Sequence, residues 1–132
     1  MQRIYMTILM VMLASSFLSG CSRSNARQVP VFPVDGQLFV DGKPAVGALI
    51  TFHGTDANAT PAREAVVRPD GHFVALQPDG AIGLPEGTYS LTATWPEGDT
   101  DRLAGKYADK AKPIAQVTVT SGINFIPAIK LP

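Results

Sequence analysis

The sequence predicts an all-β fold: a single β-sandwich of about seven short strands. Three observations lead to this prediction. From Val34 onward, no segment of useful length has a helical period. Instead, short segments recur in which apolar and polar residues alternate, as half-buried strands require. The 12 Gly and 11 Pro residues place turns between many of these segments, and short strands joined by such turns are typical of sandwiches.

The first two predicted strands are Gly36–Val40 and Ala48–His53. Asp41-Gly42 follows the first strand, and this pair favours a type I′ hairpin turn because both positions need a positive φ. The apolar residues from Ala48 to Phe52 alternate onto one face. We therefore expect a hairpin in which the second strand returns beside the first.

A second hairpin is predicted after the polar loop Gly54–Pro61. Its strands are Arg63–Arg68, with two valines at the centre, and His72–Leu76. Pro69-Asp70-Gly71 supplies the turn, since proline pre-sets φ and glycine accepts a positive φ.

The clearest predicted strand is Thr88–Trp95, which follows an irregular Pro- and Gly-rich stretch, Gln77–Gly87. Small hydroxyl residues alternate along it with larger apolar ones. Such a period of two predicts one solvated face and one buried face.

Pro96–Pro113 is predicted to be a long polar loop with one short turn at Leu103–Tyr107. Loops longer than about 12–15 residues are uncommon and often functional. Gln116–Thr120 and Ile123–Leu131 are expected to close the domain as strands, and Pro127 makes the last one an edge strand or a bulged one.

The predicted core is made of the apolar residues that these strands turn inward, and it is large enough for one domain without disulfides or metal. These residues are Leu38, Val40, Ile50, Phe52, Val67, Phe73, Tyr89, Leu91, Trp95, Val117, Val119 and Ile129.

The N-terminal segment has the layout of a secretory signal: a short start with Arg3, an apolar run at Ile4–Leu18, then small residues. The run is about 15 residues long, short of the ~20 that a membrane-spanning helix needs. Leu18-Ser19-Gly20-Cys21 resembles the bacterial lipobox. This resemblance implies cleavage before Cys21 and acyl chains on that residue.

Cys21 is the only cysteine, so the exported domain has no internal disulfide. Two or three acyl chains on it make a stable membrane anchor, whereas one chain binds only marginally. The expected organisation is a lipoprotein signal peptide at 1–20, a lipidated cysteine with a short tether at 21–33, and the sandwich at 34–132. We expect the protein outside the cytoplasm, on the cell membrane or the outer membrane.

Charge gives little indication of a partner. The chain has 11 basic and 11 acidic residues, and removal of Arg3 with the signal leaves 10 against 11. A near-neutral domain without a basic cluster argues against nucleic acid as a partner.

Three motifs of the domain resemble those of carboxypeptidase regulatory-like and transthyretin-like domains. The first is Val34–Leu38 with Val40–Ala48, the second is Arg68–Phe73, and the third is Leu84–Ala93. The likeness covers nearly all of Val34–Leu131 and implies an immunoglobulin-like sandwich of the transthyretin or prealbumin type. The residues of these motifs favour turns and the starts of strands, so the motifs indicate a fold rather than an activity.

The resemblance does not bring an enzymatic activity with it. In carboxypeptidases this module accompanies a separate zinc-dependent catalytic domain, and we expect no such domain here. Transthyretin-like hydroxyisourate hydrolases end in Tyr-Arg-Gly-Ser, whereas this chain ends Ile129-Lys130-Leu131-Pro132.

Few residues in the sequence suggest chemistry. His53 and His72 stand at strand ends, and their spacing is not that of a zinc site. The sequence also has no Gly-x-Ser-x-Gly motif, which would place a serine nucleophile. Asp99, Asp101 and Asp109 carry oxygen ligands that suit calcium. The loop's lysines and arginine largely cancel their field, so we expect a solvated loop of mixed charge and no metal or cofactor.

Trp95 and Tyr107 flank the same loop, and aromatic side chains there are suited to contact a sugar or a protein partner. Trp95 continues the buried face of its strand, so we expect it in the core and Tyr107 at the surface. The candidate binding loop is therefore marked by Asp99, Asp101, Tyr107 and Asp109.

These observations predict a non-enzymatic, lipid-anchored sandwich of the cell envelope that acts as a structural or binding module. Its expected partners are the membrane, through Cys21, and an envelope protein or polysaccharide. One alternative is a small-ligand-binding or hydrolytic domain, favoured if both histidines share a pocket with Arg63 or Lys43. Another is a subunit that assembles through an edge strand.

Overall fold

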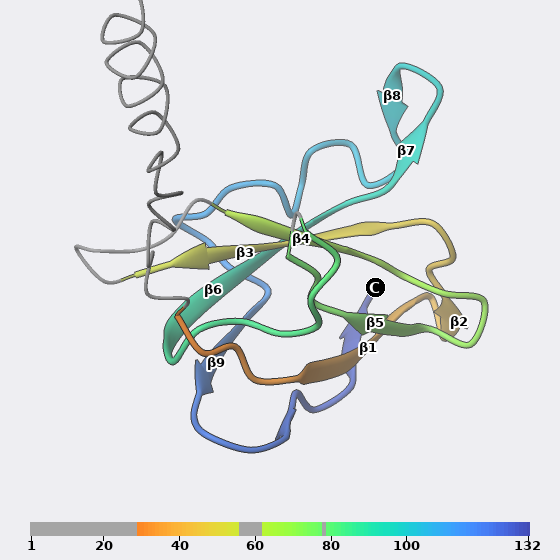
Figure 1. Ribbon diagram of the computed structural model, residues 1–132. Coiled ribbons are helices and arrows are strands. Elements are labelled where there is room, and N and C mark those ends of the chain that lie inside the picture. Colours follow the sequence, from red (N-terminus) through yellow and green to blue (C-terminus); the bar gives the residue numbers. More distant parts are fainter. Residues whose placement is uncertain (1–28, 56–61, 78) are drawn as a thin grey trace, which may run out of the picture.

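The computed structural model describes residues 29–55, 62–77 and 79–132, and this part folds as an all-β sandwich (Figure 1). The described residues form more strands than the seven that the sequence predicts, because several of them are only two or three residues long. The strands are β1 (Val34–Val40), β2 (Lys43–Pro44), β3 (Leu49–Gly54), β4 (Arg63–Val66), β5 (His72–Val74), β6 (Gly87–Thr94), β7 (Pro96–Glu97), β8 (Thr100–Asp101), β9 (Ala115–Val119), β10 (Asn124–Phe125) and β11 (Ile129–Leu131).

β1 is the centre of the first sheet. One of its edges pairs antiparallel with β5 and β2, and Leu38 bonds there to Gly71 and Ala45. The other edge pairs in parallel with β10 and β11. These two strands form one interrupted edge strand with Pro127 in the interruption, which confirms the edge position expected from that proline.

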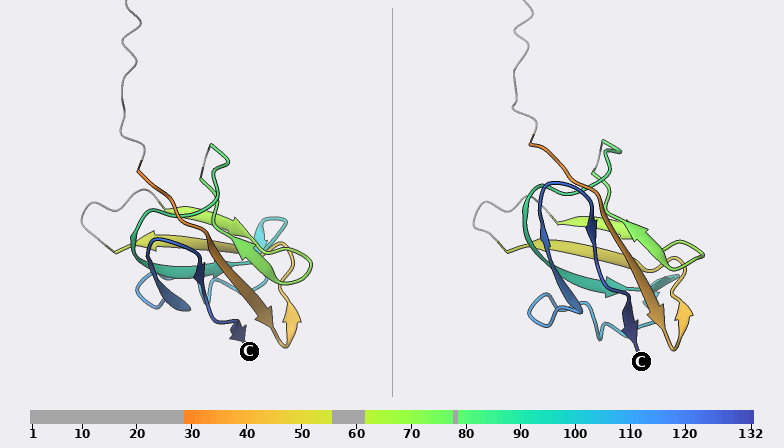
Figure 2. Two further views of the ribbon diagram at one scale, coloured as in Figure 1. Left: turned by 60° about the horizontal axis from the view of Figure 1, so that its bottom comes forward. Right: turned by 90° about the horizontal axis from the view of Figure 1, so that it is seen from below.

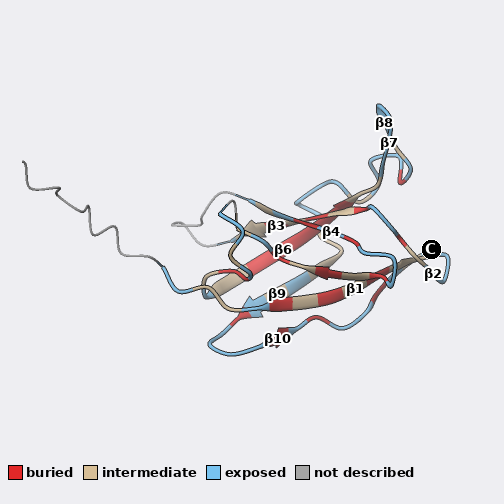
Figure 3. Ribbon diagram, turned by 45° about the vertical axis from the view of Figure 1, so that its right-hand side comes forward, coloured by how far each residue is buried: buried red, intermediate tan, exposed pale blue. Residues whose placement is uncertain are grey.

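The second sheet has the antiparallel order β4-β3-β6-β9. The longest pairing joins β3 to β6, from Leu49 opposite Thr94 at one end to Gly54 opposite Tyr89 at the other. The two sheets pack face to face, and the views in Figure 2 show them as separate layers. Buried and more exposed residues alternate along β1 and β3, as expected for strands with one inner face (Figure 3).

Both predicted hairpins are wrong in their pairing. The Asp41-Gly42 turn is present, but it returns β1 onto the two-residue β2, and β3 lies in the other sheet. The turn before His72 likewise leads from β4 in one sheet to β5 in the other. Turn residues fix a local reversal, whereas the burial of two apolar faces against each other decides which sheet each strand joins.

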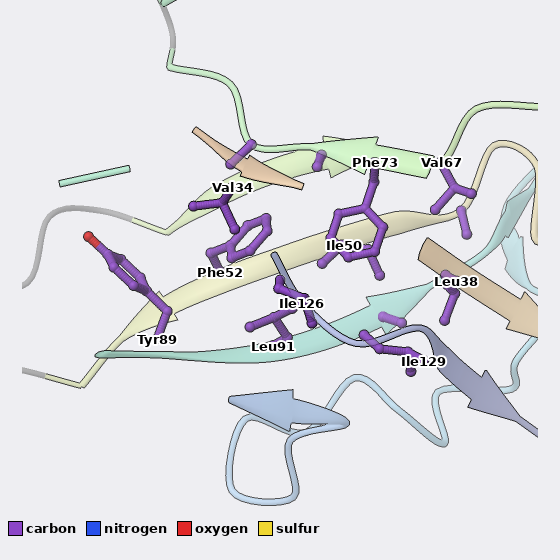
Figure 4. Packing of buried hydrophobic residues seen from close by; sticks show 14 of the residues in the cluster. Val34, Leu38, Ile50, Phe52, Val67, Phe73, Tyr89, Leu91, Ile126 and Ile129 are labelled. Atoms are coloured by element: carbon purple, nitrogen blue, oxygen red, sulfur yellow. The ribbon is translucent and has the colours of Figure 1, made fainter. Parts of the chain in front are cut away.

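The core lies between the sheets (Figure 4). Nine of the twelve predicted core residues are buried, and the exceptions, Val40, Trp95 and Val117, pack against the core while partly exposed. Leu84 and Leu103, from segments predicted as loops, are also buried. The rings of Phe52 and Phe73 join the sheets with centroids 6.2 Å apart.

β6 differs from its predicted pattern on one face. Tyr89, Leu91 and Ala93 are buried as expected, but Ser90 and Thr92 of the predicted solvated face are only 7% and 4% exposed. On that face, the His53 side chain of the neighbouring β3 lies against Thr92, with its Nε2 atom 2.9 Å from the hydroxyl oxygen.

Tyr89 fixes the corner before β6. Its hydroxyl donates a hydrogen bond to the carbonyl of Pro85, four residues upstream, at 2.8 Å. A tyrosine near the start of a strand that bonds back in this way is a hallmark of immunoglobulin-like sandwiches.

Candidate functional site

The predicted binding loop is more ordered than its composition suggests. Its first part forms a small hairpin in which Pro96 pairs with Asp101 and Glu97 with Thr100. This β7–β8 hairpin projects from the end of the sandwich where β6 finishes (Figure 1). Asp99 is exposed in its turn.

Asp101 holds the base of the hairpin together. Its Oδ1 accepts hydrogen bonds from the backbone N–H groups of Trp95 (2.7 Å) and Leu103 (2.9 Å), and its Oδ2 accepts one from Gly105 (2.9 Å). Burial alone raises the pKa of this carboxyl, but the three N–H donors outweigh it and bring the pKa below its ordinary value. Asp101 therefore stabilises the loop as an ionised carboxylate.

Trp95 anchors the hairpin on its other side. The indole N–H donates to the carbonyl of Val46 at 2.9 Å, and the guanidinium carbon of Arg102 lies 3.8 Å from the ring centroid. Arg102 also approaches Glu97 across the hairpin, at 3.5 Å. The result is an exposed cation–π pair beside an acidic turn.

The rest of the loop runs along the edge of β6. Backbone bonds join Arg102 to Trp95, Ala93 to Tyr107 and Ile114 to Leu91, and Leu103 is buried against the core. The predicted turn at 103–107 is present. Only the stretch from Ala108 to Pro113 leaves this edge.

The structure does not bring the predicted loop residues together around one point. Asp101 is used by the loop backbone, and Asp109 accepts a hydrogen bond from Ala111 N–H in a turn of its own. Tyr107 is partly buried against the core, with Lys106 Nζ 5.4 Å from its ring centroid. Among the residues that the structure describes, no group of three or more His, Cys, Asp or Glu is placed to hold a metal ion.

Arg102 and Val46 are the site residues that the sequence did not reveal. Arg102 stands seven positions after Trp95, and only the hairpin between them brings the two side chains into contact. Val46 is remote in sequence and meets the indole through its backbone carbonyl, for which side-chain patterns carry no signal.

The predicted lipidation site lies outside the described residues. This applies to Cys21 and to the lipobox residues Leu18, Ser19 and Gly20. Within the described part of the chain, no helix has the length and apolar character needed to cross a membrane.

The two histidines lie on opposite outer faces of the sandwich. His72 Nδ1 contacts Asp35 Oδ1 at 3.0 Å, and His72 Nε2 lies 2.9 Å from the amide nitrogen of Gln37. This arrangement suits a neutral ring with its proton on Nδ1. On the other sheet, His53 Nε2 lies 2.9 Å from the hydroxyl oxygen of Thr92.

Their surroundings shift the two imidazoles in opposite directions. The hydrogen bond to Asp35 raises the pKa of His72 above its ordinary value, and the charges of Asp35 and Asp70 add to this. Partial burial lowers the pKa of His53, with a further contribution from the charge of Lys110. Within the described ranges, the Thr92 hydroxyl is the one nucleophile that bonds to either ring, and it lies within a regular strand.

No family model matches this chain, and a search of curated proteins finds no match either.

Proposed function

We propose that this chain is a lipid-anchored protein of the cell envelope whose sandwich acts as a non-catalytic binding module, with the β7–β8 hairpin as its contact site. The observation that carries the proposal is the construction of the hairpin. Asp101 fixes its base through three backbone bonds, and Trp95 and Arg102 hold its side. A projecting loop that is ordered before binding loses less conformational entropy on contact with a partner.

The surface of the hairpin suits a polar or carbohydrate-bearing partner. It offers exposed Glu97 and Asp99 at the turn and Arg102 stacked on Trp95. Tryptophan and arginine are enriched where binding energy concentrates in interfaces. An envelope protein or polysaccharide with hydrogen-bonding groups is the class of partner that this surface fits.

The lipid anchor is supported by the sequence motif that ends at Cys21 and by the short distance from there to the domain. β1 begins at Val34, and the seven residues 22–28 span at most roughly 25 Å when extended. The sandwich would therefore act close to the membrane surface.

Intact mass and membrane fractionation of the native protein, beside a Cys21→Ser variant, test the anchor. We expect the wild-type mass to fit cleavage before Cys21 plus acyl chains, and the variant to lose both modifications. An unmodified Cys21 in the native protein would contradict the proposal.

Site-specific photo-crosslinking in intact cells tests the hairpin. A photoreactive residue at Asp99 is expected to give a discrete adduct, whereas the same residue at exposed Lys130, on the outer face of the first sheet, gives none. Equal adducts from both positions, or none from Asp99, would remove the hairpin as the contact site and leave the anchor unaffected.

Assembly through an edge strand is a second candidate, favoured by one observation. The β10–β11 edge carries Phe125, 74% exposed, and Ile123 beside it is 69% exposed. Light scattering across a range of concentrations distinguishes the two roles, because self-assembly raises the measured mass with concentration. The hydrolytic alternative loses its main support, since the histidines lie on opposite faces and do not share a pocket with Arg63 or Lys43.

A further inference from the structure

We propose that the hollow beside Arg63 binds a small molecule or peptide end that carries a single carboxylate group. This site is separate from the β7–β8 hairpin. The hairpin follows the Thr94 end of β6, whereas Arg63 pairs with Phe52 toward the opposite end of the second sheet. The proposal does not depend on the hairpin or on the lipid anchor.

The hollow lies where the first described residues meet the start of β4 and the irregular segment before β6. Its volume is about 330 Å³, which is within the range of small-molecule sites, at its lower end. Besides Arg63, its lining residues are Val29, Val31, Gln77, Asp79, Ala81 and Pro85.

The strand register turns Arg63 toward the inside of the sandwich. Ala65 and Val67 follow it at intervals of two, on the same side of the strand, and they are only 2% and 1% exposed. Arg63 thus stands at the end of an inward-facing row, where the core gives way to the hollow. Arg63 as a whole is half-buried, with its guanidinium at the hollow.

Among the residues that the structure describes, none is a polar partner of the Arg63 side chain. Its Nε atom is buried, and no acceptor within the described part of the chain takes a hydrogen bond from it. Arg63 also forms no ion pair with Asp79, the one described acid of the lining. A buried donor without an acceptor costs folding free energy, and a bound acceptor would remove that cost.

A carboxylate supplies what Arg63 lacks. The planar guanidinium presents its N–H groups in a fork that matches the two oxygens of a carboxylate. The walls formed by Val29, Val31 and Pro85 provide apolar contact for a short body behind that group. Exposed Asp79, with exposed Glu64 and Glu86 nearby, disfavours a doubly charged anion such as phosphate.

The test is an NMR titration of the full native chain, as purified from cells, with three probes: N-acetyl-alanine, its uncharged amide N-acetyl-alaninamide, and inorganic phosphate. We expect saturable shifts of the Gln77 and Ala81 amide signals with the carboxylate alone. Replacement of Arg63 by Met should weaken this binding by about tenfold or more, since it removes charge-assisted hydrogen bonds. Arg68→Met, at an exposed arginine of the same β4–β5 segment, should leave it unchanged.

Thermal unfolding of Arg63→Met separates a binding role from a structural one. The variant keeps an apolar stem and removes an unpartnered donor, so its unfolding midpoint should equal or exceed that of the wild type. A lower midpoint would mean that Arg63 supports the fold and would overturn the proposal. Equal binding of the amide, preference for phosphate, absence of saturation, or unchanged binding by Arg63→Met would each overturn it as well.

Discussion

The two histidines, considered as single residues, differ in what surrounds their rings. His72 faces Asp35 and Asp70, with the opposing charge of Arg68 also nearby. His53 lies against Thr92, in reach of the charge of Lys110. Because the pKa of one ring is raised and the pKa of the other is lowered, they give the free energy of unfolding opposite dependences on pH.

The raised pKa of His72 predicts a loss of stability on the alkaline side. The folded state holds this proton more tightly than the unfolded state, so its contribution is fully present below about pH 6.5. It is lost as the pH rises through the pKa of the folded protein. Urea unfolding between pH 6 and 8 should show a declining midpoint, and His72→Gln should flatten the decline. An unchanged slope in the variant would refute this assignment.

The lowered pKa of His53 predicts the reverse on the acidic side. The unfolded state takes up this proton first, so stability should rise with pH up to about 6.5. In the same urea experiment between pH 5 and 6.5, His53→Gln should reduce the rise, while His72→Gln should leave it in place. Together the two histidines favour a stability maximum near pH 6.5.

The β7–β8 hairpin shows how one carboxylate shapes an element. Short hairpins are marginally stable by themselves, and this one depends on the three N–H groups that Asp101 accepts. Asp101→Asn keeps the shape but turns one acceptor into a donor. We expect a loss of about 1–2 kcal/mol in the free energy of unfolding and faster proteolysis between Glu97 and Tyr107.

Asp99→Asn, in the turn of the same hairpin, is the matched control and should change stability by less than about 0.5 kcal/mol. The lowered pKa of Asp101 also predicts how stability depends on pH. The contribution of Asp101 to the free energy of unfolding is present above its pKa in the unfolded state, and it is lost as the pH falls through its pKa in the folded state. Equal behaviour of the two variants would show that the carboxylate does not hold the hairpin.

The same elements show what the sequence could and could not predict. Alternation along Thr88–Trp95 identified β6 and its inner face, and Pro127 identified the edge position of the last strand. The alternation did not predict that Ser90 and Thr92, on the outer face of β6, are buried as well. Burial of the outer face depends on which neighbours a strand has in the folded protein. In the loop, a list of acidic residues did not reveal that Asp101 bonds to the backbone.

Across the whole molecule, local sequence patterns could not predict which of the two sheets each strand joins. Asp41-Gly42 and Gly71 each mark a reversal, yet one reversal closes a short hairpin and the other passes between sheets. Arg63 reads as an ordinary charged residue at a strand start, and only the assembled sandwich shows that its Nε is buried. Both the assignment of strands to sheets and the burial of Arg63 Nε depend on contacts between residues that are far apart in the sequence.

Gly36 offers a test of how β1 and β5 pack against each other in the first sheet. It stands inside β1 opposite Phe73, and a Cβ added there would overlap the Phe73 ring. The glycine is thus required by a close approach rather than by a turn. Gly36→Ala should cost about 1–3 kcal/mol through overpacking, because the ring is fully buried and has little room to move.

A double-mutant cycle with Phe73→Leu decides whether that cost comes from the ring. The smaller side chain makes room for the added methyl group, so the double variant should lose less stability than the two single variants combined. Urea unfolding of the four proteins measures the coupling. Simple additivity would mean that the cost comes from the conformation of β1 itself and not from contact with the Phe73 ring of β5.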